Sequence, residues 1–111
     1  MRMNWIDAHI HLWSSDIEKY PLAENLTAED LDPSNFTPDM YLDHAKSSDI
    51  DRVIIVQTGY HQFDNSYAID AVKCRPDTFR VIGIVDENKE NVRENMEMLL
   101  PLGITGFRIG A

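Results

Sequence analysis

The stretch that decides the fold is Trp5-Ile6-Asp7-Ala8-His9-Ile10-His11-Leu12-Trp13. Apolar and polar residues alternate along it, and successive side chains of a strand point to opposite faces. One predicted face carries Ile6, Ala8, Ile10 and Leu12, and the other carries Trp5, Asp7, His9, His11 and Trp13. The two histidines then lie ~6.6 Å apart, close enough to act on one ion or one substrate group. We expect a strand with a functional polar face; the alternative is a half-buried strand with two ordinary histidines.

The rest of the chain predicts three more strands that alternate with three helices. Four consecutive β-branched residues, Val53 to Val56, are typical of a strand buried on both faces of a parallel sheet. The patterns predict helices from Thr37 to about Ser47, from Asn65 or Ser66 to about Arg75 and from about Lys89 to Leu100, and strands at 52–57, 79–85 and 104–109. This βαβαβαβ order predicts a parallel α/β sheet, either an open doubly wound sheet or part of a (β/α)₈ barrel.

The polar face of the first strand favours the barrel. A central strand of an open sheet is covered by helices on both faces, whereas a barrel strand turns its inner face toward functional groups near the C-terminal mouth. His9 and His11 stand at the C-terminal end of their predicted strand. We therefore expect the first four βα units of a (β/α)₈ TIM barrel, with strands in the order 1-2-3-4 and helices on one side only.

Length and charge restrict the class of protein. The chain has 111 residues and 43% apolar residues, which predicts a single domain over 1–111 with enough apolar side chains for a core. Its net charge of −9 argues against nucleic acid and anionic membranes as partners. No apolar run approaches the ~18 residues of a membrane span, and Cys74 is the only cysteine, so we expect a cytoplasmic protein with a small-molecule substrate.

A long acidic segment follows the first strand, from Ser14 to Phe36. Segments of this length without regular structure are often lids or binding loops in compact domains. The equally weighted alternative is a solvated excursion with a short helical turn near residues 28–31.

Several segments resemble the amidohydrolase superfamily, in particular its amidohydrolase-2 branch, which includes sugar lactonases and pyrone-dicarboxylate lactonases. The first strand looks like that branch's first-strand motif. Other similar segments are Tyr20-Pro21, Phe36-Thr37-Pro38, Ile50 to Gln57, His61-Gln62-Phe63-Asp64-Asn65 and Gly103 to Arg108. The resemblance covers essentially the whole chain, but only the N-terminal half of the family's barrel, since a complete barrel needs ~250 residues.

The resemblance implies a hydrolase that opens a lactone of a small oxygenated acid. His9 and His11 would be the catalytic and metal-binding residues, holding a divalent metal such as Zn²⁺ or polarising the carbonyl without one. His61, Arg108 and Tyr60 would contact the substrate, with Arg108 holding a carboxylate in a bidentate fork. Asp7 is interpreted as a structural residue beside the histidines, and Asp86 as a turn residue.

The rival prediction is a non-catalytic half-barrel. Four strands cannot close a barrel, so the open edges and inner face need cover, which a homo-oligomer could supply. The family's later histidines and its aspartate on the eighth strand have no counterpart in this sequence. We therefore expect a truncated barrel that is incomplete for catalysis on its own.

Overall fold

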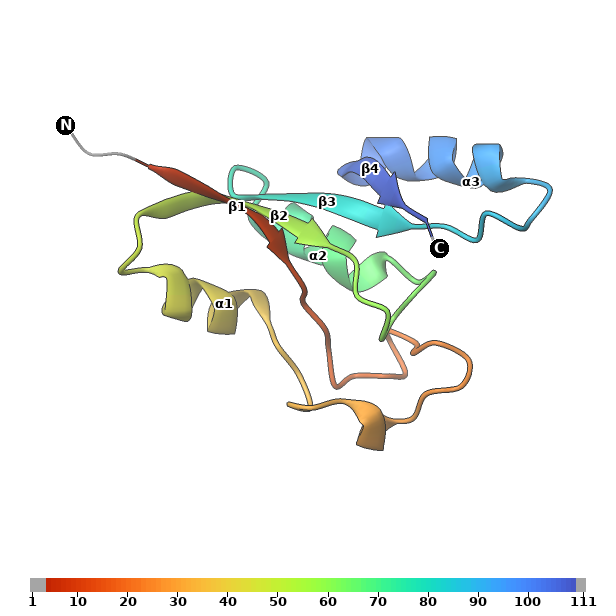
Figure 1. Ribbon diagram of the computed structural model, residues 1–111, viewed down its shortest axis with the longest axis horizontal. Coiled ribbons are helices and arrows are strands. Elements are labelled where there is room, and N and C mark those ends of the chain that lie inside the picture. The colour runs from red at the N-terminus through yellow and green to blue at the C-terminus, as the bar shows by residue number, and fades with distance from the viewer. Residues whose placement is uncertain (1–3, 110–111) are drawn as a thin grey trace.

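Four parallel strands form one sheet in the order β1-β2-β3-β4 (Figure 1). The computed structural model describes residues 4–109. The strands are β1 (Trp5–Ile10), β2 (Ile50–Val56), β3 (Phe79–Ile84) and β4 (Ile104–Arg108). The predicted strand order and direction are confirmed.

Three helices connect the strands: α1 (Pro38–Ala45), α2 (Ser66–Cys74) and α3 (Val92–Leu99). Short 3₁₀ turns lie at η1 (Ala28–Asp30), inside the acidic segment, and at η2 (Leu100–Leu102). Helix α3 starts later than predicted because Lys89 still belongs to a turn, in which its N–H donates to the Asp86 carbonyl at 3.2 Å. None of the described helices has the length and apolar character needed to span a bilayer.

The helix starts show which side chains act as caps. Thr37 accepts the Met40 N–H at 3.2 Å, as predicted for α1. Asn65 occupies the N-cap position of α2, but its side chain clamps β3 instead. Its Oδ1 accepts the Ile84 N–H and its Nδ2 donates to the Ile84 carbonyl, both at 2.9 Å. Gly83 lies beside this clamp, where a Cβ would stand 3.0 Å from Asn65 Oδ1.

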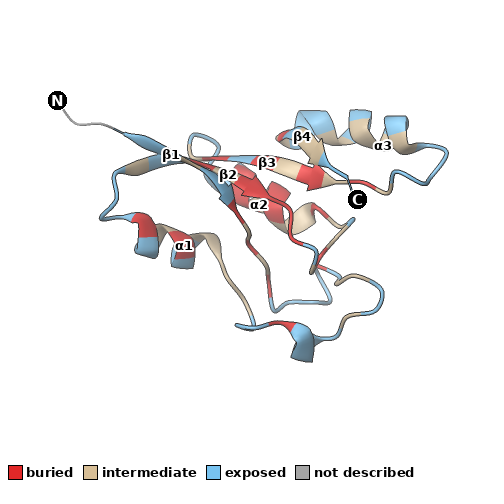
Figure 2. Cartoon of the chain, viewed as in Figure 1, coloured by how far each residue is buried: buried red, intermediate tan, exposed pale blue. Residues whose placement is uncertain are grey.

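All three helices pack on one face of the sheet, as predicted. One apolar cluster joins α1, α2 and the sheet, and Leu99 of α3 packs against it. The helices contribute Tyr41, Ala45, Ala68, Ile69, Ala71 and Val72. The sheet contributes Ile10, Val53, Ile55, Phe79, Val81 and Ile104 to this cluster. Figure 2 shows the buried residues concentrated where α2 meets the strands. The opposite face carries no described helix, which is the arrangement of a barrel segment.

Strand β1 departs from the predicted alternation. It ends at Ile10, and Trp13 pairs with Phe36 in an isolated antiparallel bridge. Its register with β2 shifts between Asp7, opposite Val53, and Ile10, opposite Ile55, so β1 holds one extra residue there. Such a β-bulge moves the following side chains to the other face. Ile10 and Leu12 are buried as predicted, whereas Ile6 is 49% exposed and Ala8 is exposed.

Candidate functional site

His9 and His11 lie together at the C-terminal end of β1. Their ring centroids are 5.0 Å apart in an edge-on arrangement. The Nδ1 of His11 lies 2.7 Å from the carbonyl oxygen of Val56, the last residue of β2. Because a carbonyl only accepts, Nδ1 carries a proton, and in the neutral ring Nε2 keeps its lone pair. His11 is half-buried and His9 exposed, so this pair can present an unprotonated nitrogen to a substrate or an ion.

Arg108 reaches the same end of β2 from the other side. Its Nη1 donates to the carbonyl of Gln57 at 3.1 Å, one residue beyond the carbonyl that His11 holds. Arg108 is exposed and makes no ion pair with an acidic side chain of residues 4–109. This single bond leaves other N–H groups of the guanidinium for a carboxylate. The sheet thus brings His11 and Arg108 to neighbouring carbonyls.

His61 has no ring nitrogen left for a substrate. Its Nε2 accepts the Ser14 N–H at 3.1 Å, and its Nδ1 donates to the Pro21 carbonyl at 3.1 Å. The ring is 2% exposed. The loop that carries His61 follows β2 at the predicted rim, but its side chain turns under the acidic segment and fixes it. The structure therefore places both ring nitrogens of His61 in contacts with the chain itself, and the substrate contact stays a prediction.

Tyr60 is likewise engaged by neighbouring segments. Its ring packs edge-on against Trp13 at a centroid distance of 5.2 Å, and its carbonyl accepts the Ala23 N–H at 2.8 Å. The hydroxyl of Tyr20 donates to Asp70 on α2 at 2.6 Å. The acidic segment is thus tied to the loop after β2 and to α2, and it contains at η1 the short helical turn that was predicted near residues 28–31.

A depression of about 580 Å³ opens at this rim. The acidic segment, the loops after β2 and β3 and the end of β4 all contribute to it, through Leu26, Gln62, Phe63, Asp86, Asn88 and Arg108 among others. Of the predicted site residues only Arg108 lines it. Asp86 is also the turn residue that was expected, since its Oδ1 accepts the Asn88 N–H at 3.1 Å. The histidine pair and the depression are therefore neighbouring features that share the end of β2 through Arg108.

The histidine pair fits part of a metal site. A metal-binding histidine usually donates its other ring N–H to a carbonyl or carboxylate, which His11 does. A catalytic zinc site usually takes three protein ligands. Within residues 4–109 no three His, Cys, Asp or Glu side chains are grouped to hold an ion. His9 and His11 could therefore supply two ligands, and the described chain supplies no third.

Tyr41 contacts the strand that carries the histidines, although sequence reasoning placed it only in the apolar stripe of α1. Its hydroxyl donates to Asp7 Oδ2 at 2.7 Å, which also puts Asp7 on the helix side and away from the predicted histidine face. Burial first, and the bond to Asp7 second, raise the pKa of Tyr41 well above its usual value. The signal in the sequence was the tyrosine itself, because a buried hydroxyl needs a partner.

The fold and the chain's length can be compared with known proteins. A family model described as Amidohydrolase matches residues 6–111. A protein of Acinetobacter baumannii assigned as a 2-pyrone-4,6-dicarboxylic acid hydrolase, solved with citric acid bound, is 23% identical with a TM-score of 0.74. The alignment covers 96% of this chain and 37% of that one. No curated protein matches the chain.

Two further solved structures have the same fold. One is an apo structure from Agrobacterium tumefaciens, 25% identical with a TM-score of 0.65, covering 93% of this chain and 35% of that one. The other, from Pseudomonas putida, is also assigned as a 2-pyrone-4,6-dicarboxylic acid hydrolase. It is 20% identical with a TM-score of 0.69 and covers 97% of this chain and 37% of that one. The chain thus spans somewhat more than a third of these proteins.

Proposed function

Because this chain belongs to the amidohydrolase family, we propose that it is the N-terminal part of a hydrolase that opens a lactone of a small carboxylated acid. The observation that carries this proposal is the pair of side chains bound to two consecutive carbonyls where β2 ends, those of Val56 and Gln57. His11 is held by the Val56 carbonyl and Arg108 by the Gln57 carbonyl. His11 offers a ring nitrogen and Arg108 offers the paired N–H groups of a guanidinium, both at the end of β2.

Each residue has a distinct task in this proposal. Arg108 binds a carboxylate of the substrate with the N–H groups that Gln57 does not occupy, and so orients the ring. His9 and His11 lie beside the scissile carbonyl, where His11 Nε2 faces the reacting end. If a divalent metal is bound by the two histidines, it supplies a Lewis acid and lowers the pKa of a water molecule.

The names of the relatives suggest the first substrate to test. Two of them are assigned as hydrolases of 2-pyrone-4,6-dicarboxylic acid, a lactone with two carboxylates. A carboxylated lactone matches the role proposed for Arg108, whereas a neutral sugar lactone leaves that arginine without a partner. The proposal therefore favours the carboxylated ring over the sugar lactone.

The test is an assay of ring opening by the protein that contains this chain, with 2-pyrone-4,6-dicarboxylate and a neutral sugar lactone as substrates. We expect turnover of the carboxylated ring, and a loss of about 100-fold or more in kcat/KM for His11→Ala. Arg108→Ala should mainly raise KM, and Arg108→Lys should recover little, because an ammonium lacks the fork. Arg75→Ala is the matched control, since Arg75 lies on the helix side.

A protein that opens neither lactone, while its ring-nitrogen signals show His11 folded against Val56, would contradict the proposal. That result would favour the rival prediction of a non-catalytic half-barrel.

A further inference from the structure

The bulge in β1 puts the side chains of Asp7 and His9 on different faces of the sheet, whereas strict alternation would have put both on one face. Asp7 stands opposite Val53 and Ile10 opposite Ile55, so Ala8 and His9 together oppose Ile54. Paired residues of neighbouring strands point to the same face, and Val53 and Ile55 both belong to the apolar cluster. Asp7 therefore turns toward the helices, while His9 contacts the ring of His11.

The carboxylate of Asp7 connects this bulge to helix α1. Its Oδ1 accepts the backbone N–H of His9 at 3.3 Å, and its Oδ2 accepts the hydroxyl of Tyr41 at 2.7 Å. A bulge leaves its extra residue outside the ladder, so a side-chain acceptor replaces the missing partner. Tyr41 is 7% exposed and cannot exchange its bond for one to water without leaving the core.

The histidine pair is then fixed from two directions. His11 is held by β2 through the Val56 carbonyl. The backbone of His9 is held by α1 through Asp7, and the two rings touch. A hydrogen bond accepted by a carboxylate is stronger than one accepted by a neutral group, so Asp7 is well suited to link the Tyr41 hydroxyl to the His9 N–H.

We propose that Asp7 and Tyr41 are positioning residues, which fix the bulge in β1 and thereby set the direction of His9 relative to His11. The proposal rests on the proposed function only in taking His9 and His11 as the acting pair. Neither Asp7 nor Tyr41 touches the substrate in this arrangement; both act through the backbone of His9.

The test uses four variants of the 111-residue chain. Asp7→Ala removes both acceptors, and Tyr41→Phe removes only the anchor on α1. Asp7→Asn keeps an oxygen for the His9 N–H and an amide that can donate to the Tyr41 hydroxyl. Tyr20→Phe is the matched control, because it also removes a buried tyrosine–carboxylate bond, that between Tyr20 and Asp70 at 2.6 Å.

Two readouts separate positioning from stability. The first is the set of ring ¹⁵N and ¹H resonances of His9 and His11, which report tautomer and surroundings. The second is titration with Zn²⁺ as a probe of the pair. We expect Asp7→Ala to weaken Zn²⁺ binding about 10-fold, Tyr41→Phe less, and Asp7→Asn to stay near the native value. Tyr20→Phe should lose stability but leave both readouts unchanged.

Two results would overturn the proposal. One is a native set of His9 and His11 resonances in folded Asp7→Ala, and the other is an equal change of both readouts in Tyr20→Phe. If the native chain binds no Zn²⁺, the metal part of the proposed function fails. The ring resonances still decide whether Asp7 and Tyr41 direct the pair.

Discussion

His11 and His61 use Nδ1 in the same way and differ in what Nε2 contacts. Each donates Nδ1–H to a backbone carbonyl, His11 to Val56 at 2.7 Å and His61 to Pro21 at 3.1 Å. The Nε2 of His61 then takes the Ser14 N–H, and the ring is 2% exposed. The Nε2 of His11 has no such partner among the hydrogen bonds of residues 4–109, and the ring is only half-buried.

This difference distinguishes a histidine that can bind a ligand from one whose side chain only stabilises the fold. The tautomer is the same in both, so it does not distinguish them. The second nitrogen does, because Nε2 of His61 accepts a hydrogen bond from Ser14, whereas Nε2 of His11 has no hydrogen-bond partner within residues 4–109. The region around β1 is therefore open for function, and the region around His61 is closed by the acidic segment.

The largest effect should come from His61→Ala. The change leaves the Ser14 N–H and the Pro21 carbonyl without their partner and opens a cavity, so we expect a loss of about 3 kcal/mol in unfolding free energy. His11→Ala should cost about 1 kcal/mol, because its side chain is half-buried and leaves one carbonyl. Urea unfolding measures both.

His61→Gln and His44→Ala serve as controls for that comparison. Glutamine keeps an acceptor for the Ser14 N–H, so it should recover part of the lost stability. His44 is exposed on α1 and should cost less than about 0.5 kcal/mol. A greater loss for His11→Ala than for His61→Ala would reverse the assignment of the two histidines.

The second prediction concerns Zn²⁺ and the open nitrogen. Two histidines are fewer than the three ligands of a usual catalytic site, so the 111-residue chain should bind Zn²⁺ weakly and open lactones no faster than buffer. The His9→Ala, His11→Ala double variant should bind about 10-fold more weakly still, by calorimetry. Tight stoichiometric binding with turnover by the native chain would contradict the idea that the site is incomplete.

A smaller effect is expected where the acidic segment meets α2. Tyr20→Phe removes the hydrogen bond to Asp70 and should cost about 1 kcal/mol. Burial, followed by the bond to Asp70, raises the pKa of Tyr20 above the usual value near 10.

That shift gives the prediction a pH dependence. The folded chain keeps the Tyr20 proton while the unfolded chain loses it, so this contribution is present below about pH 10 and falls as the pH rises further. Thermal unfolding between pH 8 and pH 11 should therefore show a smaller alkaline loss in Tyr20→Phe than in the native chain. An identical alkaline loss in both proteins would argue against this bond.

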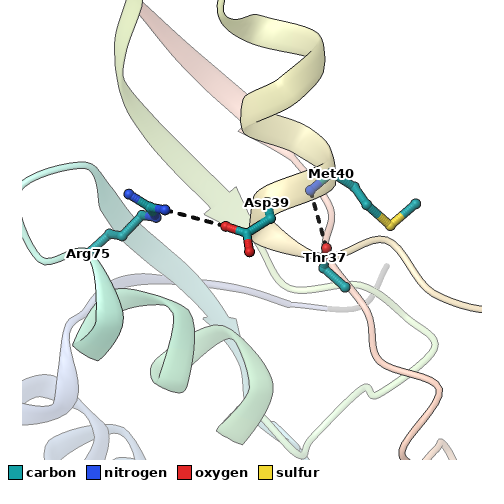
Figure 3. A network of polar contacts seen from close by, with 4 residues as sticks. All are labelled: Thr37, Asp39, Met40 and Arg75. Carbon is teal, nitrogen blue, oxygen red and sulfur yellow. Dashed lines mark hydrogen bonds and ion pairs between the residues drawn. The ribbon is translucent and has the colours of Figure 1, made fainter.

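The smallest effect should come from a contact open to water. Arg75 of α2 and Asp39 of α1 form an ion pair at 3.3 Å, shown in Figure 3 beside the Thr37 cap. Both side chains are at least half exposed, so Arg75→Ala should cost less than about 0.5 kcal/mol. Lys46→Ala, which breaks the exposed pair with Asp43, should behave alike. A cost near that of His61→Ala would show that the packing of α1 on α2 depends on this pair.

Local patterns in the sequence were enough to predict the architecture. The β-branched run at 53–56 and the alternation of strand and helix patterns predicted a parallel α/β sheet, and the resemblance predicted the family. The cap at Thr37 was also readable, because it depends on residues only three positions apart. These features are local, or follow from the fixed periods of helix and strand.

Which polar side chains are open to a ligand could not be predicted, because it depends on contacts between segments far apart in the sequence. The bulge that puts the Asp7 side chain on the opposite face from the His9 ring depends on the register between β1 and β2. These strands are far apart in the sequence: His11 and Val56, which contact each other, are 45 residues apart. The use of both His61 nitrogens depends on Ser14 and Pro21, far from it in sequence. A side chain's hydrogen-bond partners set its chemistry, and distant segments become partners only when the chain folds.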